Sequence, residues 1–237
     1  MIEYRLLTEF RQLFEGTKYI HRASNLGDFV AMHLYEDLFA IHRSDKYTLG
    51  VESKERVLNA QNKRKGIVAR RGDGTFGEII PGEEPIVDPG YKVARGPVAT
   101  VEIGVEVKIL AKAMIKQIDR VTGDLNTQVT HFKRRSGSCE PLCVGIVGIN
   151  HAAMTTSYEA DRYPTDGRTH KHPFQEAPEA RRRLEANAAP AYDEFLVLRY
   201  SATNEPPYPF DRVDYADTVQ DYGAILTRIS RNYNKRF

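Results

Sequence analysis

The segment Val98-Ala-Thr-Val-Glu-Ile-Gly-Val-Glu-Val-Lys-Ile-Leu110 decides how this chain folds. From Val101 to Ile109 every odd position is apolar, whereas the even positions hold Glu102, Gly104, Glu106 and Lys108. Alternation with a period of two predicts a β-strand, because alternate side chains of a strand share one face. Glu106 and Lys108 are therefore expected to point to the same side of a sheet.

The residues after this strand predict a crossover to a parallel neighbour. Apolar residues then recur at helical spacing, at Leu110, Met114, Ile118 and Val121. Residues 142–149 follow as an almost unbroken apolar run, which is typical of a strand buried on both faces. A strand, a helix and a buried strand in this order predict two parallel strands joined by a right-handed crossover.

The remaining pattern completes an α/β expectation with one domain. Helices are expected over residues 1–15, ending near Gly16, over 28–41, and, as a polar helix, over 52–64. Short strands are expected at 66–71 and 76–80, around a turn with Asp-Gly at its centre. A helix over 178–187, a strand over 195–200 and a helix from Tyr215 to Tyr233 follow. We divide the domain into a helical part (1–64), a core (about 66–150) and a C-terminal elaboration (151–237).

Composition excludes several classes of protein. The 237 residues carry 34 Lys+Arg against 32 Asp+Glu, and 41% are hydrophobic, which is ordinary for a globular domain. The longest apolar runs fall far short of the about 18 residues that a membrane span needs, and residues 1–15 lack the apolar core of a signal peptide. Two cysteines cannot build a disulfide framework. We therefore expect a cytoplasmic protein without a membrane partner.

The charges are unevenly distributed. Residues 54–71 hold seven basic side chains and one acidic one, while the stretch from Glu78 to Glu106 is rich in carboxylates. Basic clusters beside a carboxylate-rich centre suit a protein that binds a phosphate backbone and also holds cations. The candidates for DNA contact are basic residues of this cluster and two lysines that follow the Glu-x-Lys strand: Lys63, Arg64, Lys65, Arg70, Arg71, Lys112 and Lys116. The long polar segment 150–175 is a further candidate.

The tripeptide Glu106-Val-Lys108, with an upstream acid at Asp88 and a helix and buried strand downstream, resembles the PD-(D/E)XK nuclease superfamily, the fold of many type II restriction endonucleases. The resemblance covers roughly residues 27–150. It implies a central mixed β-sheet with helices on both faces and a catalytic set of Asp88, Glu106 and Lys108. In that family a proline directly precedes the first acid, whereas here Pro89 follows Asp88, so Glu78 is the substitute candidate.

The resemblance implies Mg²⁺-dependent hydrolysis of DNA. Carboxylates would hold one or two Mg²⁺ ions through oxygen, and the metal set would be Asp88 and Glu106, with Glu78, Glu102 and Glu36 as additional acids. Such an ion activates water and offsets charge at the phosphate, while Lys108 would orient the attacking water. The products would carry 5′-phosphate ends. A restriction enzyme acting on double-stranded DNA is expected to be a homodimer, because a two-fold protein matches a palindromic site.

Two other functions stay open. The first is a DNA-binding protein of the same fold that has lost its activity. The second is an unrelated α/β enzyme, such as a metal-dependent hydrolase, or an interaction module, in which Glu-x-Lys is incidental. A zinc hydrolase could draw its ligands from polar side chains of the segment 150–175, namely His151, His170, His172, Asp161 and Asp166. RNA or modified DNA as the substrate also stays open.

Overall fold

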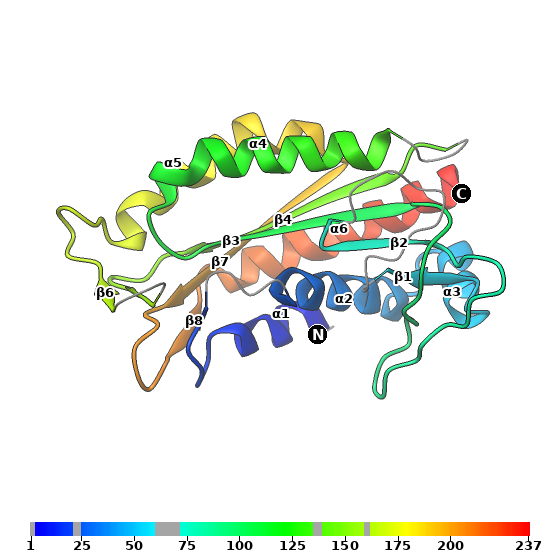
Figure 1. The fold of residues 1–237 in the computed structure, drawn as a ribbon, viewed down its shortest axis with the longest axis horizontal. Coiled ribbons are helices and arrows are strands. Elements are labelled where there is room, and N and C mark those ends of the chain that lie inside the picture. Colours follow the sequence, from blue (N-terminus) through cyan, green and yellow to red (C-terminus); the bar gives the residue numbers. More distant parts are fainter. Residues whose placement is uncertain (1–2, 21–24, 60–71, 135–138, 159–161) are drawn as a thin grey trace.

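Residues 3–20, 25–59, 72–134, 139–158 and 162–237 are described in a computed structural model of the chain (Figure 1). In chain order the elements are α1 (Arg5–Glu9), the 3-10 helix η1 (Phe10–Leu13), α2 (Asn25–Ala40), α3 (Asp45–Glu52), β1 (Arg56–Leu58), β2 (Gly74–Glu78), β3 (Ile103–Leu110), α4 (Met114–Lys133), β4 (Leu142–Asn150), β5 (Thr156–Ser157), β6 (Tyr163–Pro164), α5 (Pro173–Asn187), the 3-10 helix η2 (Ala189–Ala191), β7 (Glu194–Ala202), β8 (Phe210–Arg212) and α6 (Tyr215–Arg236).

One mixed sheet of six strands organises these elements. Its strand order is β1-β2-β3-β4-β7-β8. The first three strands form an antiparallel meander, whereas β3, β4 and β7 are parallel to one another. The predicted parallel pairing of residues 103–110 with 142–149 is therefore confirmed, and so is the α/β class. A restriction-endonuclease-like core is a finer statement and remains a prediction.

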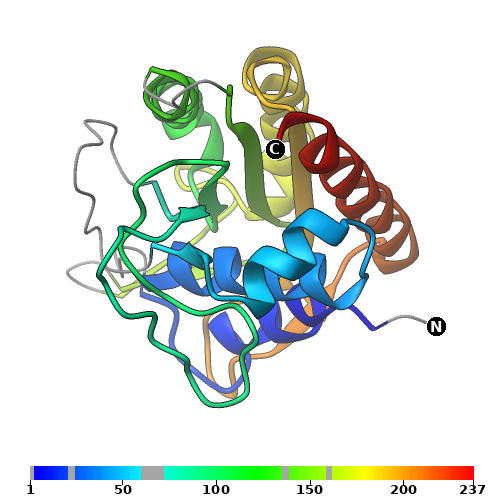
Figure 2. The same cartoon turned by 90° about the vertical axis from the view of Figure 1, so that its right-hand side faces the viewer.

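Helices cover both faces of the sheet (Figures 1 and 2). On one face α4 and α5 pack together and bury Leu110, Val147 and Ile149 of the strands. On the other face α1, α2, α3 and α6 bury the odd positions of β3, with Tyr35 and Phe76 at the centre of that core. All nine residues of β4 are buried, which explains their apolar character.

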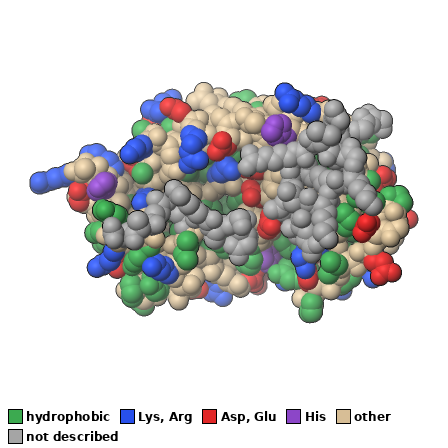
Figure 3. Space-filling view, in the orientation of Figure 1, with side chains coloured by type: hydrophobic (Ala, Val, Ile, Leu, Met, Phe, Trp, Pro, Cys, Tyr) green, Lys and Arg blue, Asp and Glu red, His purple; other side chains and the backbone are tan. Residues whose placement is uncertain are grey.

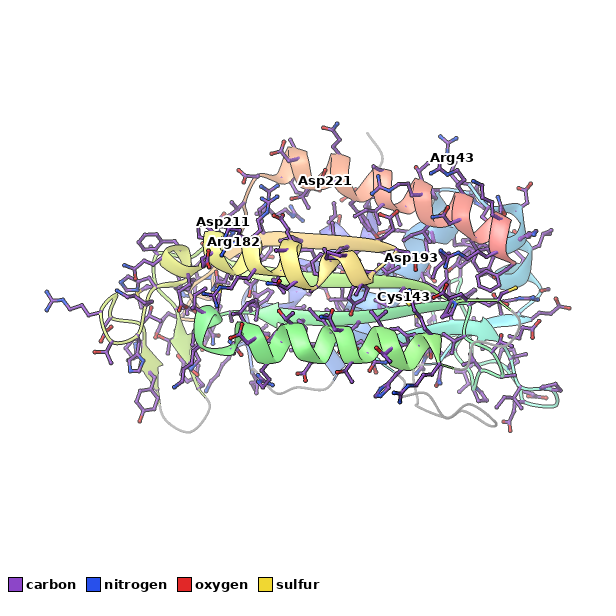
Figure 4. The ribbon with its side chains drawn as sticks, turned by 90° about the horizontal axis from the view of Figure 1, so that it is seen from above. Arg43, Cys143, Arg182, Asp193, Asp211 and Asp221 are labelled. Atoms are coloured by element: carbon purple, nitrogen blue, oxygen red, sulfur yellow. The ribbon has the colours of Figure 1, made fainter. Side chains whose placement is uncertain are left out.

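The beginnings of β4 and β7 are tied to the end of α6. The Asp193 carboxylate accepts a hydrogen bond from the Cys143 backbone N–H at 2.8 Å and pairs with the Arg236 guanidinium. Figure 4 shows Asp193 and Cys143 close together where the two strands start. Burial raises the pKa of the Cys143 thiol to about 12, so this thiol is protonated at neutral pH.

The expected polar helix over residues 52–64 is wrong in its described part. The helix in this region is α3, which Ser44 caps through the Tyr47 N–H at 3.2 Å and which ends at Glu52. Lys54 then adopts a positive φ of 61°, and residues 56–58 form β1 instead. Pairing with β2 buries Val57 and Leu58, and this tertiary contact outweighs helix propensity. Residues 60–64, and the strand expected over 66–71, lie outside the described residues.

Other boundaries shift by smaller amounts. The first expected helix is divided into α1 and η1, and it stops before Gly16, whose φ is +67°. The helix expected from residue 178 starts earlier, at Pro173, where a proline at the first position costs no hydrogen bond. The strands expected at 76–80 and 195–200 are β2 and β7, and the strand expected within residues 98–110 is β3, which begins only at Ile103. No helix in the described ranges is both long enough and apolar enough to span a membrane.

Candidate functional site

The candidate site lies where β2 ends and the second half of β3 continues without it. β2 pairs with residues 103–105 of β3. Beyond that point Glu106 and Lys108 extend on the α4 face, and their side chains form an ion pair between Lys108 Nζ and Glu106 Oε1. Glu106 is buried, whereas Lys108 is about one-quarter exposed. Glu106 stands opposite Gly145 of β4, where a Cβ would collide with Phe195.

Asp73 sits directly beside this pair. Its backbone N–H donates to the Val105 carbonyl at 3.2 Å, and its carboxylate Oδ2 accepts from the Val107 N–H at 2.7 Å. These two bonds place Asp73 on the edge of β3 at the level of Glu106. Any side chain at residue 27, in the first turn of α2, would collide with the Asp73 carboxylate. Glycine at position 27 therefore lets α2 approach the acid closely.

Both carboxylates act on one buried phenol. Burial raises the pKa of Tyr192, and the negative charges of Glu106 and Asp73 add to this effect. The Tyr192 hydroxyl donates to the Leu125 carbonyl of α4 at 2.9 Å.

A groove of about 960 Å³ opens at Asp73 and Lys108. Asp73, Lys108 and the beginning of α2 line one side, and the beginning of α4 lines the other. The groove side of α4 carries Lys116, Gln117, Arg120, Val121 and Asp124, preceded by Lys112. Lys and Arg side chains gather over this part of α4 in Figure 3. The lining of the groove therefore holds more basic than acidic side chains.

Part of the positive charge that α4 brings to the groove is neutralised by an acidic side chain of the same helix. Arg120 Nη1 lies 3.6 Å from the Asp124 carboxylate, one turn further along α4. Lys112 and Lys116 thus supply most of the net positive charge that the groove offers, because Lys108 is paired with Glu106. An anionic chain in the groove is attracted to this lysine-lined part.

The beginning of α4, which lines the groove, is held in place by a carboxylate from another helix. Ala113 precedes α4 with a positive φ of 47° and brings no side-chain cap. Instead, Glu176 of α5 accepts a hydrogen bond from the Met114 N–H at 2.8 Å, and Glu176 is buried. A carboxylate at a helix N-terminus satisfies an unpaired N–H and favours the helix dipole. Glu176 therefore orients the helix that carries Lys116.

The structure does not bring Asp88 to Glu106. Asp88 forms a bidentate ion pair with Arg95 through Nε and Nη2. Arg95 lies beside Leu58 of β1, on the far side of β1 and β2 from β3. Arg95 is therefore three strand spacings away from β3, which corresponds to about 14 Å.

Glu78 is also remote from Glu106. Glu78 is at the opposite end of β2 from Asp73, about 16 Å along the strand, and pairs with Arg56 at 3.1 Å.

The other two acids of the expected metal set hold the fold together elsewhere. Glu102 precedes β3 and accepts hydrogen bonds from Tyr233 of α6 and from Arg56 Nε at 3.3 Å. Glu36, on α2, accepts from the backbone N–H groups of Lys92 and Val93 at 2.8 and 2.7 Å.

Of the expected DNA contacts, Lys112 and Lys116 line the groove. Lys63, Arg64, Lys65, Arg70 and Arg71 lie outside the described residues.

Asp73 was missed by the sequence reasoning because Gly72-Asp73-Gly74 reads as a turn. The signal that could have found it is an acid directly before a strand that pairs with the Glu-x-Lys strand.

The donor set fits a hard cation that keeps most of its waters. Among the described residues, His, Cys, Asp and Glu side chains form no group of three or more that would hold a metal by themselves, and this applies to the described histidines His151, His170 and His172 as well. Two neighbouring carboxylates, Asp73 and Glu106, offer oxygen atoms only. Mg²⁺ is commonly bound by one or two carboxylates, with waters and substrate phosphates completing the shell.

The geometry therefore assembles an acid, a Glu-x-Lys pair and a lysine-lined groove on two adjacent strands and one helix. No protein-family model, no curated protein and no solved structure matches this chain.

Proposed function

We propose that this protein is a metal-dependent deoxyribonuclease whose chemistry centres on Asp73, Glu106 and Lys108. The observation that carries the proposal is the hydrogen bond from the Val107 N–H to the Asp73 carboxylate, which sets this acid beside the Glu106–Lys108 ion pair. Asp73 and Lys108 line a groove that Lys112 and Lys116 also line, and the buried Glu106 lies behind Lys108. Hydrolysis of a phosphodiester needs positive charge at the phosphate and a positioned water, and this arrangement offers the means for both.

Asp73 and Glu106 would hold Mg²⁺. The ion supplies Lewis acidity toward the phosphate and lowers the pKa of bound water. Asp73 suits this role because the Val107 N–H fixes its orientation through one oxygen, Oδ2.

Lys108 has a separate task in this proposal. It lines the groove and is partly exposed, so its ammonium group can reach both water and phosphate. We assign it the orientation of the attacking water, with compensation of the charge that develops on the phosphate oxygens. Water attacks phosphorus, the bond to the 3′ oxygen breaks, and 5′-phosphate and 3′-hydroxyl ends result, as the resemblance to the PD-(D/E)XK nucleases implies.

Asp73 takes the position that the sequence reasoning gave to Asp88 or Glu78. With this change, the order of an α-helix, an antiparallel meander, a helix and a parallel strand supports a restriction-endonuclease-like core. A sequence-specific restriction enzyme acting as a homodimer is the finer form of the proposal. Sedimentation velocity of the protein with and without a cleaved duplex tests the homodimer, and a monomer on DNA would contradict it.

The test is cleavage of mixed-sequence plasmid and phage DNA with Mg²⁺ or with EDTA, read on a gel. We expect discrete bands with Mg²⁺ and intact DNA with EDTA. A metal-dependent smear would retain the nuclease and remove sequence specificity. Intact DNA in both conditions, for unmodified and modified DNA alike, would overturn the proposal.

Matched variants assign the activity to the site. Asp73→Asn and Asp88→Asn change the same residue type, but only Asp73 lies beside Glu106. We expect Asp73→Asn and Lys108→Ala to abolish cleavage and Asp88→Asn to retain it. Loss of cleavage in Asp88→Asn, with cleavage retained in Asp73→Asn, would reverse the assignment.

A further inference from the structure

A rigid turn between β6 and α5 projects beside the groove. The turn comprises residues 165–172, and the Asp166 carboxylate accepts hydrogen bonds from the N–H groups of Arg168 and His170, both at 2.8 Å. The His170 carbonyl accepts in return from the N–H groups of Asp166 and Gly167, both at 3.0 Å. The backbone of His170 is therefore held by bonds on both sides.

The base of the turn is anchored as well. Thr165 is buried and its hydroxyl lies 2.8 Å from His172 Nδ1. The Gln175 side chain accepts from the His172 N–H at 2.8 Å, so the turn leads directly into the first turn of α5. Gly167 has a φ of +74°, and a Cβ there would collide with the His172 ring. Glycine is required at this position for both reasons.

This turn brings His170 to the groove. His170 lines the same groove as Lys112 and Lys116, although it comes from a different part of the chain. Its neighbours on the turn, Arg168 and Lys171, are exposed, and basic side chains on the protruding loop are visible in Figure 3. The groove is thus lined by an imidazole on a held backbone together with the lysines at the beginning of α4.

We propose that His170 contacts a DNA backbone phosphate that lies in the groove near Lys112, separate from the phosphate at Glu106 and Lys108. The inference rests on the proposed nuclease function and extends it by a binding residue. An imidazole donates an N–H to a phosphate oxygen in either protonation state. Side chains that contact phosphates set the position of a protein on its duplex without reading the sequence.

The rigidity of the turn favours binding of the phosphate by His170. Ordering a flexible loop on binding costs conformational entropy, which subtracts from the affinity. The bonds that Asp166 makes to the turn are already formed in the free protein. His170 therefore binds phosphate without that cost, and Asp166 is a positioning residue for it.

The experiment measures fluorescence anisotropy of a labelled DNA duplex of about 20 base pairs, about two helical turns, in EDTA so that the duplex stays intact. We expect His170→Ala to weaken binding about tenfold, since a hydrogen bond to a charged group is lost. His170→Gln keeps an N–H donor and should recover part of the affinity. Lys171→Ala is the matched control on the same turn outside the groove lining, with a change below about twofold expected.

A second measurement separates this contact from those of the lysines. Lys112→Ala and Lys116→Ala should each lower the slope of log affinity against log salt by about 0.9, because each removes one cation from a phosphate.

The outcomes distinguish this inference from the proposed function. Cleavage of DNA by the wild type, with equal affinities of His170→Ala and Lys171→Ala, would overturn the role of His170 and leave the nuclease in place. A wild-type protein that neither binds nor cleaves DNA would overturn both. Tighter binding to RNA than to DNA, with the same loss in His170→Ala, would keep the contact and change the nucleic acid.

Discussion

Two buried glutamates, four residues apart, mark two regions of the strand that decides this fold: Glu102 lies just before its first residue (the Glu102 end), and Glu106 lies where its pairing with β2 has stopped (the Glu106 end). Glu102 and Glu106 are both almost inaccessible to solvent. Glu102 is enclosed by Tyr233 of α6 and Arg56 of β1, two partners that belong to the fold itself. Glu106 is paired with Lys108, which opens on a groove. The same residue type therefore serves the structure at one end and a candidate chemistry at the other.

The difference follows from how far β2 extends along β3. At the Glu102 end β2 is present, and the Glu102 N–H donates to the Phe76 carbonyl at 2.8 Å. At the Glu106 end β2 has not yet begun, and the Asp73 side chain replaces its backbone as the partner of Val107. A strand that loses its neighbour leaves an edge that must be covered or used. Here residues 107–110 of β3 line the groove.

The largest expected effect is a loss of cleavage when Glu106 is substituted. Glu106→Gln should lower the cleavage rate more than about a hundredfold, since it removes a negative oxygen from the proposed metal site. Its melting temperature should fall by less than that of Glu102→Ala, because glutamine keeps the shape of the side chain and the Lys108 ammonium group can reach water. The matched control is Glu102→Gln, for which we expect cleavage per folded molecule to be retained. Kinetics and thermal unfolding on both variants check this, and equal activities would contradict the comparison.

The next largest expected effect is a loss of stability when Glu102 is substituted. Glu102→Ala leaves the Tyr233 hydroxyl and the Arg56 guanidinium without their shared acceptor. Removing one member of a buried pair costs about 3–5 kcal/mol, and Arg56 is partly exposed, so we expect a loss of about 2–3 kcal/mol. Urea denaturation measures the free energy of unfolding. Tyr233→Phe, which removes only the hydroxyl, should cost less than Glu102→Ala.

Sequence patterns predict one of these two ends better than the other. The alternation from Val101 to Ile109 places Glu106 and Lys108 on one face, and the structure has them there. Asp73 could not be found in this way, because the pairing of Gly74 with Val105 is set by tertiary contact across a long excursion, residues 79–102. A candidate acid chosen by distance in sequence, such as Asp88, fails for the same reason. Patterns report local geometry, whereas strand register is non-local.

A smaller effect concerns the wall of the groove at the Glu106 end. Glu176→Ala removes the carboxylate that accepts from the Met114 N–H at the beginning of α4. Loss of an N-terminal cap costs about 1–2 kcal/mol of stability. Glu179→Ala on the same helix is the control, because Glu179 pairs with the exposed Arg182 and the partly exposed Arg183 and caps no helix. Chemical denaturation of both variants should show the larger loss for Glu176→Ala, and equal losses would remove Glu176 as the cap.

The smallest expected effect is a pH dependence of the contribution that Glu102 makes to stability. Burial raises the pKa of the Glu102 carboxyl above its ordinary value of 4.5, and the hydrogen bond from Tyr233 and the charge of Arg56 offset only part of this. Between the ordinary and the raised pKa the folded protein binds more protons than the unfolded chain. The contribution of Glu102 to stability is therefore fully present below pH 4.5 and falls as the pH rises through the raised pKa.

The difference in unfolding free energy between the wild type and Glu102→Gln isolates this contribution, because glutamine does not titrate. We expect the difference to decrease from pH 4 toward pH 7, by about 1.4 kcal/mol for each unit by which the pKa is raised. Urea denaturation at several pH values measures it. An increase with pH would mean that the charge of Arg56 outweighs burial, and that the Glu102 end is held by an ion pair rather than by enclosure.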